Sequence, residues 1–207
     1  MATEEYHLAR RRQVADAVER LIAERGFEGV TMARAAAEAG VSVGLVQHYF
    51  SSKDDLLRYA YTRVTERMLA RALHRAEELA AHRGSIRLAL RESLAERLPL
   101  DEARRAEWRV AFAFAARAVD LPDLAAVRNR TEAAIRDQLA QAITNGKECG
   151  EVPAETDARS AAVGLLALVE GLGLHTYLDP ALPAPVVLAE LERALAGVLP
   201  GECRHYG

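Results

Sequence analysis

The sequence has few of the residues that define several common protein classes. It contains only two cysteines, Cys149 and Cys203, which lie far apart and have no Cys or His partner at the spacing of a metal site. We therefore expect two reduced thiols, no disulfide framework and no bound metal. The first residues lack the basic-then-apolar pattern of a signal peptide. The longest apolar run, nine residues from Ala161 to Val169, is far shorter than the ~20 that span a bilayer. We expect a cytoplasmic protein with no membrane partner.

Aromatic residues and helix breakers are also scarce. Aromatics make up 5% of the chain, and there are only 7 prolines and 13 glycines among 207 residues. Strands favour aromatic and β-branched residues, whereas Ala and Leu dominate here. Few prolines and glycines leave room for long uninterrupted helices. Half of the residues, 50%, are hydrophobic, which is enough for a substantial buried core. We predict an all-α protein.

An excess of positive charge is missing as well. The net charge is −3, and residues 1–60 hold eight Lys or Arg against nine Asp or Glu. Many nucleic-acid-binding domains are strongly basic, so the charge balance by itself gives no support to DNA binding. Any basic surface must come from the placement of individual side chains.

Hydrophobic spacing predicts helices along the whole chain. Val14, Val18, Leu21 and Ile22 have the spacing of one buried helix face, and we expect that helix to end near Arg25. Further helices are predicted at 32–39, 43–49, 53–82, 86–98, 101–118, 121–146, 158–177 and 188–199, with a loop at 147–155.

Two of these helices are short and are joined by a glycine-containing turn, the pattern of a helix-turn-helix. Thr31 precedes the first as an N-cap, Gly40 ends it, and Ser42 caps the second. Ser52 opens a capping box for the long helix that follows. Ordinary helical bundles contain the same geometry, so the spacing alone does not establish DNA binding.

Four runs of residues between positions 8 and 60 carry a family likeness. They are Gly26-Phe27-Glu28-Gly29-Val30-Thr31-Met32, Ala39-Gly40-Val41-Ser42, Gly44-Leu45-Val46-Gln47-His48-Tyr49-Phe50 and Ser52-Lys53-Asp54-Asp55-Leu56-Leu57. They resemble the N-terminal DNA-binding head of the TetR family of transcriptional repressors. The remainder, including Leu168-Val169-Glu170-Gly171-Leu172-Gly173-Leu174, is similar in helix layout to that family's ligand-binding and dimerisation body. The resemblance implies a head at residues 1–52 and a body at residues 53–207.

The resemblance also implies that the third helix enters the major groove, with Val41, Val46 and Phe50 turned toward the core. Gln47 can then pair with adenine, and Val43 or Leu45 can touch a thymine methyl group. Other positions match the family's phosphate contacts, which set register rather than sequence. The predicted DNA-binding residues are Thr31, Met32, Ser42, Val43, Gly44, Leu45, Gln47, His48, Tyr49 and Lys53.

Several of these residues have a structural interpretation beside the functional one. Thr31 and Ser42 are also plain N-caps. Lys53 could be a solvated charge, and His48 a simple surface residue. The basic run at residues 10–12 (Arg10, Arg11 and Arg12) forms either an arm toward the minor groove or a solvated tail.

Two features depart from the family pattern. Ala35 stands where a larger aliphatic residue is usual, which thins the core of the head. Gln47 and His48 stand where the family often has Tyr, so base preferences do not transfer.

For the body, the resemblance implies a homodimer and a small-molecule effector. The last two helices are the family's usual dimer surface, and residues 158–177, apolar on nearly every side, fit a helix packed between its own core and a partner. A monomer with a well-filled core is the alternative. Effector sites are mostly apolar with a few polar groups. The predicted effector residues are Trp108, Arg109, Phe112, Glu170 and His175, with Phe114 and Arg117 as further candidates. Trp108 as core filling and Glu170 as a helix-surface charge are the alternatives.

Two other functions stay open from sequence alone. One is an all-helical enzyme, and the other is a protein-interaction module that has kept the head without using it. The sequence shows no phosphate loop, nucleophile elbow or metal motif, and its six histidines have no ligand spacing. We expect no enzymatic activity and no cofactor, and partners that are double-stranded operator DNA, a small-molecule effector and a second copy of the chain.

Overall fold

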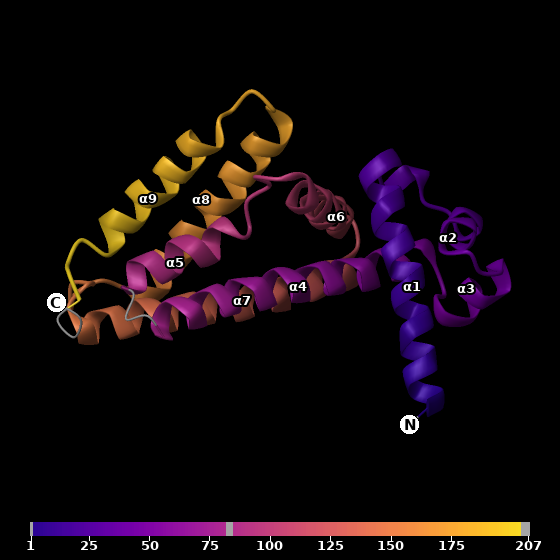
Figure 1. The fold of residues 1–207 in the computed structure, drawn as a ribbon, viewed down its shortest axis with the longest axis horizontal. Coiled ribbons are helices and arrows are strands. Elements are labelled where there is room, and N and C mark those ends of the chain that lie inside the picture. Colours follow the sequence, from indigo (N-terminus) through magenta and orange to yellow (C-terminus); the bar gives the residue numbers. More distant parts are fainter. Residues whose placement is uncertain (1, 82–84, 204–207) are drawn as a thin grey trace. The chain divides into compact units, whose positions relative to one another are not determined.

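The structure, a computed structural model, describes residues 2–81 and 85–203. Throughout these residues the regular secondary structure is helical, which confirms the predicted all-α class (Figure 1). The predicted end of the fourth helix at His82, and His205, lie outside the described residues. The elements are α1 (Ala2–Arg25), the 3₁₀ turn η1 (Phe27–Gly29), α2 (Met32–Ala39), α3 (Val43–Tyr49), α4 (Lys53–Ala81), α5 (Ile86–Ala95), α6 (Glu102–Ala118), α7 (Pro122–Cys149), α8 (Ala158–Leu178) and α9 (Ala184–Val198).

The chain forms two compact units. Unit 1 comprises Met1–Glu66 and Ala106–Ala126, and unit 2 comprises Arg67–Arg105 and Val127–Gly207. Three helices, α4, α6 and α7, therefore contribute residues to both units. Unit 1 contains the whole helix-turn-helix, and unit 2 contains the whole of α5, α8 and α9.

Helix starts follow the predicted capping residues. The hydroxyl oxygens of Thr31, Ser42 and Ser85 each accept a backbone N–H three residues on, at 3.1–3.2 Å. Ser52 likewise accepts from the N–H of Asp55 at 3.0 Å. The return bond differs from the standard capping box, because the Asp55 carboxylate accepts from the N–H of Ser51 rather than that of Ser52. Each cap satisfies one backbone donor that the first helical turn leaves free.

The core of unit 1 is made of small and medium side chains. Ala35 and Ala36 of α2 are fully buried, as is Val18 of α1, and α2 packs against both α1 and α3. Alanine at these positions permits helix backbones to approach closely, and Ala35 is fully buried although its side chain is small. Phe50, which directly follows α3, is 1% exposed and is the largest buried side chain there. Val41, expected to face the core, is only half-buried.

The core of unit 2 lies between α5, α7, α8 and α9. Its fully buried side chains include Leu98, Ile143, Leu191, Leu195 and Leu199. Figure 1 shows α9 beside both α5 and α8, and α9 packs against each of them. Side chains from helices far apart in the sequence are thereby buried together.

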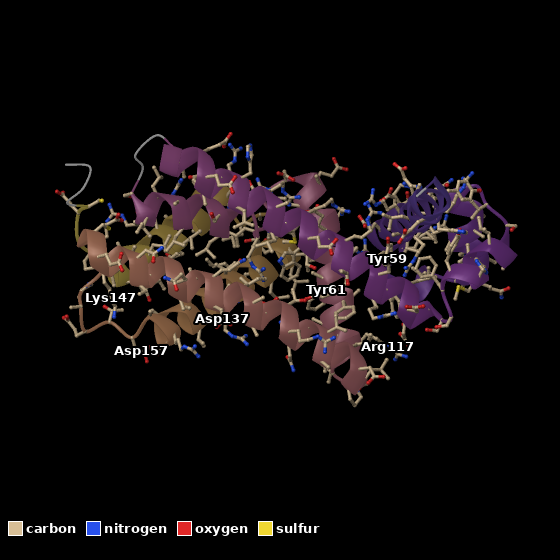
Figure 2. The ribbon with its side chains drawn as sticks, turned by 90° about the horizontal axis from the view of Figure 1, so that it is seen from below. Tyr59, Tyr61, Arg117, Asp137, Lys147 and Asp157 are labelled. Carbon is tan, nitrogen blue, oxygen red and sulfur yellow. The ribbon has the colours of Figure 1, made fainter. Side chains whose placement is uncertain are left out.

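Three predicted boundaries in unit 2 are wrong. Residues 147–149 were expected in a loop, but α7 continues to Cys149 and passes Lys147, which Figure 2 labels. Gly146 does not stop the helix. It makes room for a neighbouring side chain, because a Cβ on it would lie 2.7 Å from Cγ2 of Val152. The helix ends at Gly150, whose φ of 91° suits glycine. Similarly, α5 ends at Ala95 rather than at residue 98. Helix α9 begins at Ala184 rather than at residue 188, because Pro185 is tolerated in its first turn.

Helix α8 is the one described helix that is long and apolar enough, by length and composition, to cross a membrane. Only 33% of its apolar window is buried inside the chain. A single helix of this kind is a weak indication of membrane insertion, because core helices of soluble proteins meet the same criteria. Its exposed side carries Val163 and Leu178, at 54% and 67% exposure.

Candidate DNA-binding site and effector cavity

The turn between α2 and α3 is fixed at both ends. Gly40 ends α2 in the left-handed region, at φ 67° and ψ 35°, which glycine adopts without strain. From α1, the side-chain amide of Gln13 donates to the carbonyl of Ala39 at 2.7 Å. The position of α3 relative to α1 and α2 therefore depends on buried contacts and on this hydrogen bond rather than on the turn alone.

The faces of α3 differ sharply in exposure. Val46 and the following Phe50 are buried, whereas Leu45 and Tyr49 are half-buried. The exposed residues are Val43, Gly44, Gln47 and His48. The burial of Val46 and Phe50 agrees with the expected core side, but Leu45, which was expected on the DNA side, is half-buried. Contact of the exposed face with bases stays a prediction.

Gly44 has no structural reason to be glycine within this chain. A Cβ added to it would meet only the Ser42 hydroxyl oxygen, at 4.0 Å, and its φ is not positive. The residue therefore leaves a bare stretch of helix backbone on the exposed face. Such a surface permits another molecule to approach the backbone closely.

Lys53, at the N-terminus of α4, is held in position. Its Nζ lies 4.1 Å from the ring centroid of Phe27 and 3.5 Å from Oε2 of Glu28. Its side chain is 31% exposed, so it is not a freely solvated charge. Because Glu28 is 94% exposed, that carboxylate can turn away and leave the ammonium group for another anion.

The end of α3 contacts a residue that sequence reasoning missed. Nδ1 of His7, in α1, lies at hydrogen-bond distance, 2.5 Å, from the Tyr49 hydroxyl. The His48 and Tyr49 rings lie 5.0 Å apart at their centroids. The first turns of α1 thus reach the face predicted to meet DNA. No local signal could have identified His7, which lies 42 positions before Tyr49.

The basic run at residues 10–12 lies inside α1 and is neither an extended arm nor a tail. The Arg10 guanidinium donates to the side-chain carbonyl of Gln13 at 2.7 Å. The Arg11 guanidinium lies 4.5 Å from the ring centroid of Tyr59, which Figure 2 labels. Arg11 therefore packs on the ring of Tyr59, although its position in the sequence also suggested an arm toward DNA.

The first turn of α4 carries two aspartates, Asp54 and Asp55, that each interact with an arginine. Burial acts to raise the pKa of Asp55, but hydrogen bonds from Arg58 and Ser51 outweigh it and keep that pKa below its ordinary value. Asp54 pairs with Arg117 of α6, labelled in Figure 2, at 2.9 Å. The helix that follows α3 is thereby tied to the C-terminal end of α6.

The structure does not place the five predicted effector residues in one unit. Trp108 and Phe112 stack in unit 1, with centroids 5.6 Å apart, and the Arg109 guanidinium donates to the carbonyl of Ala23. Glu170 lies in unit 2, where it pairs with Arg128 at 2.9 Å. His175 is exposed in unit 2. A role for these residues in effector binding stays a prediction.

Unit 2 contains an apolar cavity of about 150 Å³ between α4, α5 and α7. Its polar lining groups are few. The Ser93 hydroxyl donates to the carbonyl of Ala72 at 3.0 Å, and Arg97 pairs with the buried Glu132 at 3.2 Å. None of the predicted effector residues is among the lining residues, which include Met68, Leu69, Ala72, Leu73, Ala76, Leu90, Leu94, Ile135, Gln138, Leu139 and Ala142.

The chain is all-α and contains a capped helix-turn-helix. The second helix of this motif exposes polar side chains and bare backbone. These features are those of a helix-turn-helix DNA-binding protein with a helical body. Residues 14–60 match the family "Bacterial regulatory proteins, tetR family", and residues 87–200 match "BetI-type transcriptional repressor, C-terminal". The chain belongs to the TetR family of transcriptional regulators.

Known proteins similar to this chain are regulators. It is 34% identical over 174 residues to the HTH-type transcriptional regulator PksA of Bacillus subtilis (strain 168), covering 84% of this chain and 82% of that protein. A solved transcriptional regulator from Rhodococcus sp. Rha1 has a TM-score of 0.81 and 34% identity, covering 92% of this chain and 96% of that one. A putative regulator from Saccharomonospora viridis, solved in complex with choline, has a TM-score of 0.76 and 25% identity, covering 90% and 93%.

Proposed function

We propose that this chain is a cytoplasmic repressor that binds a near-palindromic operator as a homodimer and is released by a small-molecule effector. The observation that carries the DNA-binding part is the exposed face of α3, with Gln47 in mid-helix beside bare backbone at Gly44. A glutamine amide can pair with both adenine groups that line the major groove. Its relatives are regulators and not enzymes, and we propose that this chain catalyses no reaction.

Phosphate contacts would fix this helix in the groove. Thr31 and Lys53 stand at the starts of α2 and α4, where free backbone N–H groups and the helix dipole favour an anion. Ser42 stands at the start of α3, and Tyr49 at its end. Contacts of this kind position a protein on DNA without reading its sequence.

The test is binding to the DNA upstream of the chain's own gene. We expect footprinting to show a protected near-palindrome, with half-site centres about one helical turn, ~34–36 Å, or somewhat more apart. Affinity for this fragment should exceed that for random DNA by about 10³-fold or more at physiological salt. Equal affinity for the fragment and for random DNA would contradict the proposal.

The dimer interface would be the outer sides of α8 and α9. The exposed apolar side chains there are Val163, Leu178 and Val186, at 54%, 67% and 47% exposure. Beside them, a Cβ on Gly164 or Gly171 would meet nothing within 4 Å. Exposed apolar side chains that gather on one surface are typical of an interaction site. A two-fold axis would place the same face of both copies together. Sedimentation equilibrium of the wild-type chain tests this, and a monomer at micromolar concentration would contradict it.

The effector would occupy the cavity of unit 2. One similar structure holds choline, but the chemistry of this cavity differs from that of a quaternary-ammonium site, which uses aromatic rings. The lining residues include no aromatic ring, and the charge of Arg97 is already paired with Glu132. We therefore propose an apolar effector that is uncharged, or anionic if its own charge takes the place of Glu132 beside Arg97. Isothermal titration with matched alkyl carboxylates and alkyl trimethylammonium salts would distinguish the two classes, and selective binding of the ammonium series would contradict the assignment.

Helix α4 offers a route from effector to DNA, because it contributes residues to both units. In unit 2, Met68 of this helix lines the cavity. In unit 1, Leu57 of the same helix is fully buried. A ligand that prefers one position of this helix biases the head by its differential affinity. A coupling of ~1–3 kcal/mol gives a 5–150-fold change in operator affinity, and operator DNA must weaken the ligand by the same factor. A ligand that binds without changing operator affinity would show that the cavity is not the switch.

A further inference from the structure

The two cysteines of the chain meet in unit 2 although they are far apart in the sequence. Cys149 is the last residue of α7, and Cys203 lies in the tail that follows α9. Together with Glu151, their ligand atoms all lie within 4.8 Å of one another. Cys149 and Glu151 are buried, and Cys203 is partly exposed. The sequence spacing, which suggested two unconnected thiols, did not indicate this approach.

The tail is seated by backbone contacts and not merely by the two thiols. The N–H of Gly201 donates to the carbonyl of Glu151 at 3.0 Å. A Cβ on Gly201 would lie 2.2 Å from the carbonyl oxygen of Gly150, so only glycine allows the tail to lie this close. The Arg87 guanidinium also reaches the carbonyl of Leu199. These contacts hold Cys203 near the end of α7.

The separation between Cys149 and Glu151 fits two ligands of a single tetrahedral ion. Zinc bonds of about 2.3 Å to sulfur and about 2.0–2.2 Å to oxygen, at tetrahedral angles, place the two ligand atoms about 3.5 Å apart. Sγ of Cys149 and Oε1 of Glu151 are 3.5 Å apart. In the metal-free chain this separation also suits a thiol hydrogen bond to the carboxylate. An ion could therefore replace that proton with little movement of either residue.

The carboxylate also has the support that metal ligands usually have. The two oxygens of Glu151 accept from the backbone N–H groups of Ile86 and Arg87, at 2.8 and 2.9 Å. Such outer contacts orient a ligand and are a regular part of metal sites. Cys203 is partly exposed, so an ion can reach the group from solvent at that residue.

We propose that Cys149, Glu151 and Cys203 form a binding site for a thiophilic divalent cation of the Zn²⁺ type. Two thiolates select soft or borderline metals over Mg²⁺ and Ca²⁺, and a carboxylate completes a three-ligand set that suits Zn²⁺. The fourth position is open to water or to another ligand. The site shares no residue with the exposed face of α3 or with the effector cavity, so it goes beyond the proposed function.

The test uses the full-length, untagged chain, reduced and stripped of metal, and titrated with Co²⁺ alone. We expect one Co²⁺ per chain, with thiolate-to-metal charge-transfer absorption and the intense visible bands of a tetrahedral site. Zn²⁺ should then displace Co²⁺ and raise the melting temperature. Cys203→Ser, at a partly exposed tail position, should keep the fold by circular dichroism. It should lose most of the charge-transfer absorption and weaken Co²⁺ binding at least about tenfold.

Glu202→Gln is the matched control, because Glu202 is an exposed neighbour of Cys203 and lies outside the site. We expect it to bind Co²⁺ as the wild type does. A reduced wild-type chain without charge-transfer absorption would overturn the proposal, as would a Cys203→Ser variant with unchanged absorption. A chain that forms a Cys149–Cys203 disulfide in air and takes up no Co²⁺ after reduction would also overturn it, in favour of a redox pair.

Discussion

The proposed DNA-binding face of unit 1 and the effector cavity of unit 2 are built in different ways. Most of the DNA-binding face comes from two short helices and the turn between them, so neighbours in sequence are neighbours in space. The cavity is lined from three helices, with residues between Met68 and Ala142. Local sites carry recognisable signals such as caps and glycine stops. A cavity between distant helices uses the same aliphatic residues as any core, so its lining has no signature of its own.

The largest contrast should come from removing one large buried side chain in each unit. Phe50→Ala in unit 1 should cost about 3–5 kcal/mol of stability, and Leu191→Ala in unit 2 about 2–5 kcal/mol, because each leaves a cavity. We expect Phe50→Ala to abolish operator binding while effector binding survives. Urea unfolding with both binding assays measures this. If Phe50→Ala removed both functions equally, the two sites would not be separable.

The dimer face offers the next largest effect. Val163→Asp and Val186→Asp place a charge on exposed positions of α8 and α9, so the monomer should stay folded while the dimer dissociates. Val119→Asp, at an 84% exposed position in unit 1, is the control and should stay dimeric. Sedimentation equilibrium decides the outcome. Leu191→Asp would not serve, because Leu191 is fully buried and its loss would test the core.

A smaller change should distinguish the cavity from the residues that the sequence suggested. Ala142→Leu adds bulk to the cavity lining and should weaken effector binding, because the larger side chain takes up space that the effector would occupy. His175→Ala, at an exposed position that does not line the cavity, should leave effector affinity unchanged. Titration calorimetry on both variants gives the comparison. If His175→Ala weakened effector binding and Ala142→Leu did not, the effector site would lie at the residues predicted from the sequence and not in the cavity.

Two matched N-caps give the smallest expected difference. Thr31→Ala and Ser85→Ala each remove a side-chain acceptor from the first turn of a helix and should each cost about 1 kcal/mol of stability. Only Thr31→Ala should also weaken operator binding, because Thr31 is a proposed phosphate contact. Equal operator affinity in the two variants would reduce Thr31 to a plain cap.

The features that could be predicted from the sequence are those built from neighbouring residues, as in the proposed DNA-binding face. The caps at Thr31 and Ser42 and the stop at Gly40 depend on residues within one or two turns, and local patterns identified them. The two faces of α3 were expected from the family resemblance. Contacts between distant segments had no such signal. The bond from Arg109 to Ala23 joins residues 86 positions apart. The meeting of Cys149 with Cys203 likewise exists only once the helices have packed.

Glycines show how one residue type misleads when its contacts are unknown. Gly40 and Gly146 both looked like helix stops in the sequence. Gly40 has a positive φ and is a stop, whereas Gly146 remains helical and makes room for the side chain of Val152. The difference lies in tertiary packing, which spacing along one helix does not reveal.

The account depends most on α3 reading bases while the helix N-termini bind phosphates. The most direct test measures the affinity of Gln47→Ala and Lys53→Ala for the operator and for random DNA across a range of salt concentrations. Gln47→Ala should weaken operator binding by about 1–3 kcal/mol and leave random DNA binding unchanged. Lys53→Ala should weaken both alike and reduce the salt slope by about one. A Gln47→Ala variant that keeps the full preference for the operator would contradict the assignment of α3 as the helix that reads the sequence.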